Sequence, residues 1–197
     1  MAISTKDIKK LRAITGAGLL DARSALESTE GDFDKATKIL MEKGAQIAES
    51  KSDRDALQGI IVNYIHPGDR IGVLLELNCE TDFVARNEDF KKLAHNLALQ
   101  VAGMHPIYIA PEDVPMDVLD KEKEVYSAQL QDKSKKTAEK AMQSKLDTFY
   151  EAVCLIKQPF VLNPELKIEE LIAETVGILK ENIKIARFVR FEVGNRS

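Results

Sequence analysis

The sequence predicts an α+β protein, in which an amino-terminal three-helix bundle is followed by an antiparallel-sheet domain with flanking helices. At the amino end, apolar residues recur at helical spacing and glycines interrupt them, which indicates short helices. Apolar runs rich in β-branched residues flank Pro67-Gly68-Asp69 and indicate a hairpin. Residues 183–193 largely alternate apolar and charged side chains, which is typical of a half-buried strand.

The bundle is expected within residues 1–48. Ser4 and Asp7 form a capping pair for a first helix that ends at Gly16-Ala17-Gly18, and Asp32 caps the third helix. About 45 residues bury only a small core. We therefore expect apolar surface near these glycines, which either contacts a partner or packs on the rest of the chain.

Residues 49–55 contain no apolar side chain, so we expect a solvated linker there and a core domain over 56–197. The hairpin strands are expected at 60–65 and 71–77. Near-continuous apolarity in the second strand predicts cover on both faces, by helices on one side and by another subunit on the other.

The clearest predicted helix has apolar residues recurring at helical spacing between positions 90 and 101, with Asn87 as its cap and Gly103 as its stop. A highly charged stretch at about 116–145 is expected to form a weakly packed helical arm. Further elements are expected at 106–110 (a short edge strand), 146–153 and 168–179 (helices).

Composition and motif content argue against several functional classes. A net charge of −4 gives no global electrostatic signature of nucleic-acid binding, because proteins that bind DNA or RNA usually carry a basic face. The sequence has no phosphate-loop motif, and its only G-x-G, at 16–18, follows a helix instead of a strand, so we expect no tight GTP binding and no cofactor. No secretory signal or membrane-spanning run is visible, so a cytoplasmic location is expected.

Catalytic and metal sites are also not expected. His66, His95 and His105 show no zinc-type spacing with Cys79 or Cys154. Both cysteines lie in apolar runs, which suits reduced core thiols whose pKa is raised instead of lowered.

The turn from Thr81 to Asn87 places an acid and a large aromatic directly after an apolar stretch. Thr81 can cap the turn, Asp82 can use free amides at its start, and Phe83 projects outward unless the following helix covers it. Two interpretations stay open at this point. Phe83 is either a wedge for a partner or a staple residue that holds the next helix.

Several blocks of the sequence resemble the translation elongation factor Ts family and occur in the family's order. The first resembles the family's ubiquitin-associated-like three-helix domain. The chain has length for only one sheet module, so it resembles short members that lack the second sheet module and the coiled-coil insertion and that pair as homodimers. At the linker, Gln58 stands where the family pattern has a glutamate. The matching blocks are residues 11–22 and 31–36, 78–87, 149–161 and 190–194.

The resemblance implies a guanine-nucleotide exchange factor for elongation factor Tu in translation elongation, and not an enzyme. It implies that the bundle docks on the nucleotide domain of elongation factor Tu, in its GDP-bound and nucleotide-free states, while the turn displaces magnesium and promotes GDP release so that GTP can bind. No membrane and no direct nucleic acid are expected as partners. The implied partner-binding residues are Thr81, Asp82, Phe83 and Val84, followed by Arg12, Thr15, Gly16, Gly18, Arg86 and Asn87.

Three alternatives remain open from the sequence. A three-helix bundle can instead hold a ubiquitin-like or peptide partner. Lysines along the arm can contact RNA, although acidic residues are interspersed among them. A hydrolase that uses Cys154 is the third. The lysines are Lys133, Lys135, Lys136, Lys140 and Lys145.

Overall fold

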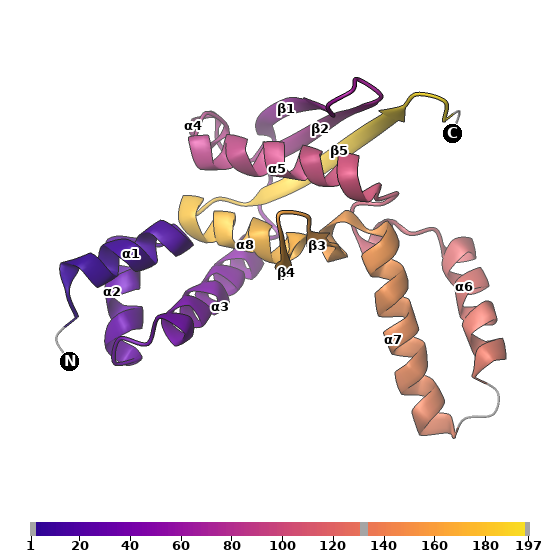
Figure 1. Cartoon of the computed structure of the whole chain (residues 1–197), viewed down its shortest axis with the longest axis horizontal. Coiled ribbons are helices and arrows are strands. Elements are labelled where there is room, and N and C mark those ends of the chain that lie inside the picture. Colours follow the sequence, from indigo (N-terminus) through magenta and orange to yellow (C-terminus); the bar gives the residue numbers. More distant parts are fainter. Residues whose placement is uncertain (1–2, 131–133, 196–197) are drawn as a thin grey trace. The chain divides into compact units, whose positions relative to one another are not determined.

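The computed structural model describes residues 3–130 and 134–195 and confirms the α+β class (Figure 1). A three-stranded antiparallel sheet has the order β1-β2-β5, and β3 and β4 form a second, small sheet. The chain divides into two compact units. Unit 1 comprises Met1–Tyr64, Leu74–Ala98 and Glu169–Val189; unit 2 comprises Ile65–Val73, Leu99–Ile168 and Arg190–Ser197. The sequence-based limits at 1–48, 49–55 and 56–197 stay a prediction.

Helices α1 (Thr5–Thr15), α2 (Leu19–Ser28) and α3 (Phe33–Lys51) form the bundle in unit 1. The predicted capping box is confirmed, because the Asp7 N–H donates to Ser4 Oγ at 3.1 Å and the Ser4 N–H donates to the Asp7 carboxylate at 3.2 Å. Asp32 caps α3 by accepting from the Lys35 N–H at 3.1 Å. The bundle core consists of Ile8, Leu11, Ala22, Ala25, Leu26 and Ala36.

Helix α3 continues to Lys51, so the start of the segment predicted to be a linker is helical. A solvent-facing helical turn needs no apolar side chain, and the polar composition of residues 49–51 therefore did not reveal it. After α3, the Ser52 N–H donates to the Glu49 carbonyl at 3.2 Å and the Arg54 N–H to the Lys51 carbonyl at 3.0 Å. These bonds close the helix and direct the chain toward the sheet.

The sheet consists of β1 (Gln58–Ile65), β2 (Ile71–Cys79) and β5 (Ile183–Glu192). Along β2, burial alternates: Leu75, Leu77 and Cys79 are buried, whereas Leu74 is 48% exposed. In unit 1 the rings of Tyr64 and His95 lie edge to face with centroids 5.7 Å apart, so α5 covers one face. The predicted helical cover is thus present on one face, and the predicted cover of the face that carries Leu74 by another subunit stays a prediction.

Helix α5 (Glu88–Met104) begins as predicted, since the Asp89 N–H donates to Asn87 Oδ1 at 2.8 Å. The predicted stop at Gly103 is wrong, because the helix includes Gly103 and Met104. The chain leaves the helix at His105, which has φ 47°, and Pro106 then prevents continuation. A glycine inside a helix costs stability without ending the helix.

The charged stretch forms a helical hairpin instead of a single arm. Helix α6 (Met116–Gln129) and helix α7 (Lys135–Val153) lie side by side, and α7 also contains the helix predicted at 146–153 (Figure 1). Lys145 joins the two helices, since its Nζ donates to Gln129 Oε1 at 2.7 Å and lies 5.1 Å from the ring centroid of Tyr126. Lys133 lies outside the described residues.

The edge strand predicted at 106–110 is wrong: Tyr108 forms only an isolated bridge with Cys154. The small sheet of β3 (Pro159–Phe160) and β4 (Asn163–Lys167) was not predicted, because these strands are short and contain two prolines. The buried Gln100 side chain holds this region by donating to Gln158 Oε1 at 3.1 Å and the Pro159 carbonyl at 3.0 Å, and by accepting from the Val161 N–H at 2.8 Å. Short helical turns at Pro111–Asp113 and Leu155–Lys157 complete unit 2.

Helix α8 (Ile168–Leu179) has the predicted limits, and it approaches the bundle closely within unit 1. A Cβ atom added at Gly177 would lie 3.0 Å from the Cα atom of Gly44. Gly16 has φ 66°, and a Cβ atom there would collide with Ile178. The loop at Gly16 therefore packs in part on the rest of the chain, which is one of the two alternatives left open by the sequence.

Candidate partner-binding site at the turn from Thr81 to Val84

Helix α4 (Asp82–Ala85) is a single turn between the end of β2 and the start of α5. Thr81 is its cap, as the sequence indicates, because Thr81 Oγ1 accepts from the Val84 N–H at 3.4 Å. The Ala85 N–H donates to the Thr81 carbonyl at 3.2 Å and closes the turn. A residue with a short polar side chain at the cap position accepts a hydrogen bond from a backbone amide of the first helical turn, which would otherwise lack a partner.

Phe83 is 79% exposed. The staple interpretation is therefore wrong, since the following helix does not cover this ring. Asp82 does not cap free amides either: its carboxylate accepts from Arg86 Nη2 at 2.8 Å, one turn along the chain. The turn thus presents an uncovered aromatic ring beside an ion pair, and Asn87 directly follows them as the cap of α5.

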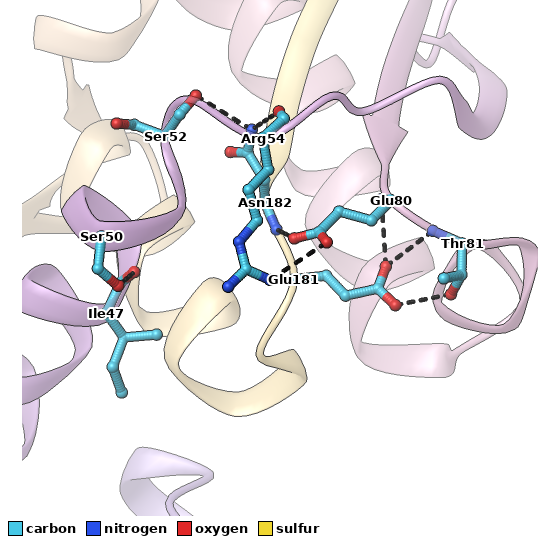
Figure 2. A network of polar contacts seen from close by, with 8 residues as sticks. All are labelled: Ile47, Ser50, Ser52, Arg54, Glu80, Thr81, Glu181 and Asn182. Atoms are coloured by element: carbon cyan, nitrogen blue, oxygen red, sulfur yellow. Dashed lines mark hydrogen bonds and ion pairs between the residues drawn. The ribbon is translucent and has the colours of Figure 1, made fainter.

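Glu181 supports the turn from a distant part of the sequence (Figure 2). Its Oε2 accepts from the Glu80 N–H at 3.1 Å and the Thr81 N–H at 2.9 Å. Its Oε1 accepts from the Thr81 hydroxyl at 2.6 Å. One carboxylate therefore accepts three hydrogen bonds from the two residues that lead into α4, and bonds to an ionised acceptor are the stronger kind.

Asn182 is buried and joins this support to the segment after α3. Its backbone N–H donates to Glu80 Oε1 at 2.7 Å, while its side-chain Nδ2 donates to the carbonyls of Ser52 at 3.2 Å and Arg54 at 2.6 Å (Figure 2). The hydrogen bond from the Asn182 N–H holds the pKa of the Glu80 carboxyl below its usual range, and the nearby Arg54 guanidinium contributes in the same direction. Glu80 is therefore ionised at neutral pH.

The buried thiol of Cys79 is a further contact below the turn, because its Sγ donates to the Thr81 carbonyl at 3.1 Å. Burial raises the pKa of Cys79 to about 11, and Glu181 acts in the same direction. Burial likewise raises the pKa of Cys154 to about 11. The predicted rise in thiol pKa is thus confirmed, and it opposes a nucleophilic role for either cysteine.

The remaining candidate residues lie on the bundle, apart from the turn. Arg12 Nε donates to the Ala17 carbonyl at 3.1 Å, and Thr15 Oγ1 donates to the Leu11 carbonyl at 2.8 Å. Gly16 is the left-handed cap of α1, and Gly18 precedes α2. These residues shape a loop that is bordered by large exposed apolar side chains, namely Ile14, Leu19 and Leu20.

Sequence reasoning missed Glu181 and Asn182. Both lie 100 or more positions from their partners: the separations are 100 to 102 for the bonds to Glu80 and Thr81, and 128 and 130 for the bonds from Asn182 to Arg54 and Ser52. A glutamate followed by an asparagine is common in solvent-exposed loops between a helix and a strand. The local sequence therefore does not indicate that these two residues hold a distant turn. Nothing in the sequence indicated the role of Lys180 either. This residue has φ 61°, and its left-handed conformation ends α8 and directs the next two residues toward the turn.

Metal sites and membrane spans are the other site types to consider. Among residues 3–130 and 134–195, no group of three or more His, Cys, Asp or Glu side chains has the arrangement needed to hold a metal ion. Over the same residues, none of the helices combines the length and apolarity required to cross a bilayer.

Comparison with known proteins identifies the family. A family profile described as Elongation factor TS matches residues 22–195. The chain is 52% identical over 194 residues to elongation factor Ts of Thermotoga maritima and 51% identical over 195 residues to that of Thermodesulfovibrio yellowstonii, with 98% of both chains covered in each case. It is 45% identical over 194 residues to elongation factor Ts of Carboxydothermus hydrogenoformans, covering 98% of this chain and 89% of that relative. The chain belongs to the elongation factor Ts family, as its sequence blocks predict.

Proposed function

We propose that the chain accelerates the release of GDP from elongation factor Tu during translation elongation in the cytoplasm, so that GTP can bind. The observation that carries this proposal is the exposed ring of Phe83 on a turn whose backbone is held by hydrogen bonds from several sides. A large exposed aromatic side chain on a fixed backbone suits insertion into a partner. The family membership supports the same role.

In the proposed mechanism, Phe83 inserts between helices of the nucleotide domain of elongation factor Tu. Burying such a side chain stabilises a complex by about 2 kcal/mol. The insertion displaces groups that hold the magnesium ion, which otherwise neutralises charge on the nucleotide phosphates, and GDP then dissociates faster. Because binding is reciprocal, the factor binds the nucleotide-free state best, and nucleotide weakens the factor's binding by the same ratio. No covalent bond is made or broken.

The bundle supplies a second contact in this proposal. Arg12, Thr15, Gly16 and Gly18 shape a loop beside exposed apolar side chains, which suits docking on the nucleotide domain. Two contacts on one chain raise the effective concentration of the wedge at its target. Docking at the bundle therefore adds to the affinity that Phe83 provides, and Phe83 in addition acts on the release step.

The test is the dissociation rate of a fluorescent GDP analogue from elongation factor Tu with and without this protein. At saturating protein we expect acceleration by about 100-fold, the upper range for a coupling between two sites. In buffer without magnesium the acceleration should shrink, because the step that the wedge promotes has already taken place. A release rate that does not respond to the protein in magnesium buffer would refute the proposed function.

We also propose that two copies pair through the uncovered face of the sheet. In unit 1 this face carries Ile61, Leu74 and Val189, all exposed, and a shallow hollow between them is lined by both β2 and β5. Exposed apolar side chains on one sheet face are typical of an interface that a second sheet covers. The same pairing would supply the cover that the apolar sequence of β2 predicts.

Replacing Leu74 with glutamate is expected to convert the protein from dimer to monomer at micromolar concentration, because each interface would then bury a charge without a partner. Light scattering measures the mass directly. The control is Lys184→Glu, which changes an exposed β5 residue that is already charged. A wild-type chain that scatters as a monomer at the same concentration would contradict the proposed pairing.

A further inference from the structure

We infer that Glu181 is a positioning residue for nucleotide exchange, which fixes the backbone from Glu80 to Val84 so that Phe83 is presented in the geometry that inserts into the partner. The inference rests on the proposed function for its consequence, but its structural part can be measured without elongation factor Tu. The residue lies between α8 and β5, 100 positions from Thr81, and it has no other assigned role.

The contacts form a reciprocal clasp between two dipeptides. Backbone N–H groups of Glu80 and Thr81 donate to the Glu181 carboxylate, and the backbone N–H of Asn182 donates to the Glu80 carboxylate (Figure 2). Glu80 and Thr81 thus offer two amides and a carboxylate, and Glu181 and Asn182 offer one amide and a carboxylate in return. Two such connections restrain position and orientation together, which a single hydrogen bond does not.

The clasp continues into α4 through the Thr81 hydroxyl. This hydroxyl donates to Glu181 Oε1 at 2.6 Å and accepts from the Val84 N–H at 3.4 Å. Without a hydrogen-bond partner at position 181, the Thr81 hydroxyl could turn away from the geometry in which it accepts from the Val84 N–H. Glu181 therefore fixes the cap of α4 as well as the residues before it, and Phe83 lies between the two fixed points.

The exposure of Phe83 gives this restraint a functional consequence. Because Phe83 is 79% exposed, little packing fixes its ring, so the position of the ring depends chiefly on the backbone. If only a fraction of molecules presents the ring correctly, the apparent affinity for the partner falls by that fraction, while the complex that forms is unchanged. Loss of Glu181 should therefore raise the concentration of factor needed for half-maximal release and leave the maximal release rate intact.

The first part of the test follows the turn itself. The sequence contains no tryptophan, so a Phe83→Trp change introduces one fluorophore, located on the turn. Time-resolved anisotropy of this indole is compared with and without Glu181→Ala. We expect Glu181→Ala to increase the amplitude of the fast, local decay. Glu181→Gln keeps one side-chain oxygen for the two amides and a donor for the Thr81 hydroxyl, so its decay should stay close to that of the parent.

The matched control is Gln100→Ala in unit 2. Gln100 also makes three hydrogen bonds from a buried side chain, but its partners are Gln158, Pro159 and Val161. Its loss should lower the unfolding midpoint without changing the local decay of the indole. Comparison at equal fractions folded, judged from circular dichroism, separates positioning of the turn from general loss of stability.

The second part measures GDP release with Phe83 restored. For Glu181→Ala we expect about a tenfold rise in the half-saturating concentration, which corresponds to a competent fraction of about one tenth, at an unchanged maximal rate. Glu181→Gln should raise it less than about threefold, since neutral hydrogen bonds are roughly half as strong as charge-assisted ones. Gln100→Ala should leave it unchanged.

The outcomes are distinguishable. An unchanged local decay in Glu181→Ala, or a maximal rate that falls while the half-saturating concentration stays constant, overturns the positioning role. If the wild-type chain fails to accelerate release at all, the proposed function is wrong, and the anisotropy still decides whether Glu181 orders the turn.

Discussion

Replacing Phe83 with alanine should abolish most of the exchange activity, lowering the maximal release rate of a fluorescent GDP analogue by about 100-fold. Truncating an aromatic residue that a partner encloses typically costs 2 to 4 kcal/mol, which corresponds to roughly 30- to 900-fold. The same change should leave the unfolding midpoint almost unaltered, because Phe83 is 79% exposed and substitutions of exposed residues usually alter stability by less than about 0.5 kcal/mol.

The control for this prediction is Met116→Ala. Met116 is a large apolar residue with comparable exposure, 68%, in the first turn of α6. Its loss should leave release unchanged, whereas Phe83→Leu should retain part of the activity because an apolar side chain remains. Full activity of Phe83→Ala at saturating concentration would show that the wedge is not the element that acts on the nucleotide site, even if exchange itself is confirmed.

Local signals in the sequence predicted much of the fold. The capping box at Ser4 and Asp7, the Asp32 cap and the turn after Ile65 each depend on residues a few positions apart, and the structure confirms all three. The helical hairpin was predicted only as an arm, because its helices pair across a connection that periodicity does not describe. The end of α5 was misplaced for a similar reason: the conformation of His105, and not the composition at Gly103, ends the helix.

The candidate site divides in the same way. The Thr81 cap could be predicted because its hydrogen bond spans three residues. Whether Phe83 is covered could not, because coverage depends on the path of α5 after the turn. The Glu181 clasp is formed across a separation of 100 residues, and no local pattern marks either end. The residues that position the turn are thus less visible in the sequence than the residues that the turn presents.

Replacing Gly59 with alanine should strongly destabilise the fold, because β1 and β2 approach each other closely at this residue. A Cβ atom added there would overlap the carbonyl oxygen of Leu77 and would lie 2.6 Å from Asn78 Oδ1 and 2.8 Å from the Asn78 Cα atom. Two of these three neighbours are backbone atoms, which cannot move aside without displacing the strand. Gly59→Ala should therefore lower the free energy of unfolding by about 3 kcal/mol, the upper range for an overpacked site.

For a chain of this size, about 3 kcal/mol corresponds to a fall of roughly 10 °C in the melting temperature. Gly103→Ala is the matched control: the nearest heavy atom to an added Cβ is a Val161 methyl at 4.0 Å, and the position is helical, so this change should stabilise the protein by up to about 1 kcal/mol. Identical substitutions should thus have opposite signs in a thermal melt. Because Leu77 and Asn78 lie just before Thr81, Gly59→Ala should also weaken exchange at temperatures where most of the protein remains folded. A melting temperature within 2 °C of the wild type would contradict the close approach of the two strands.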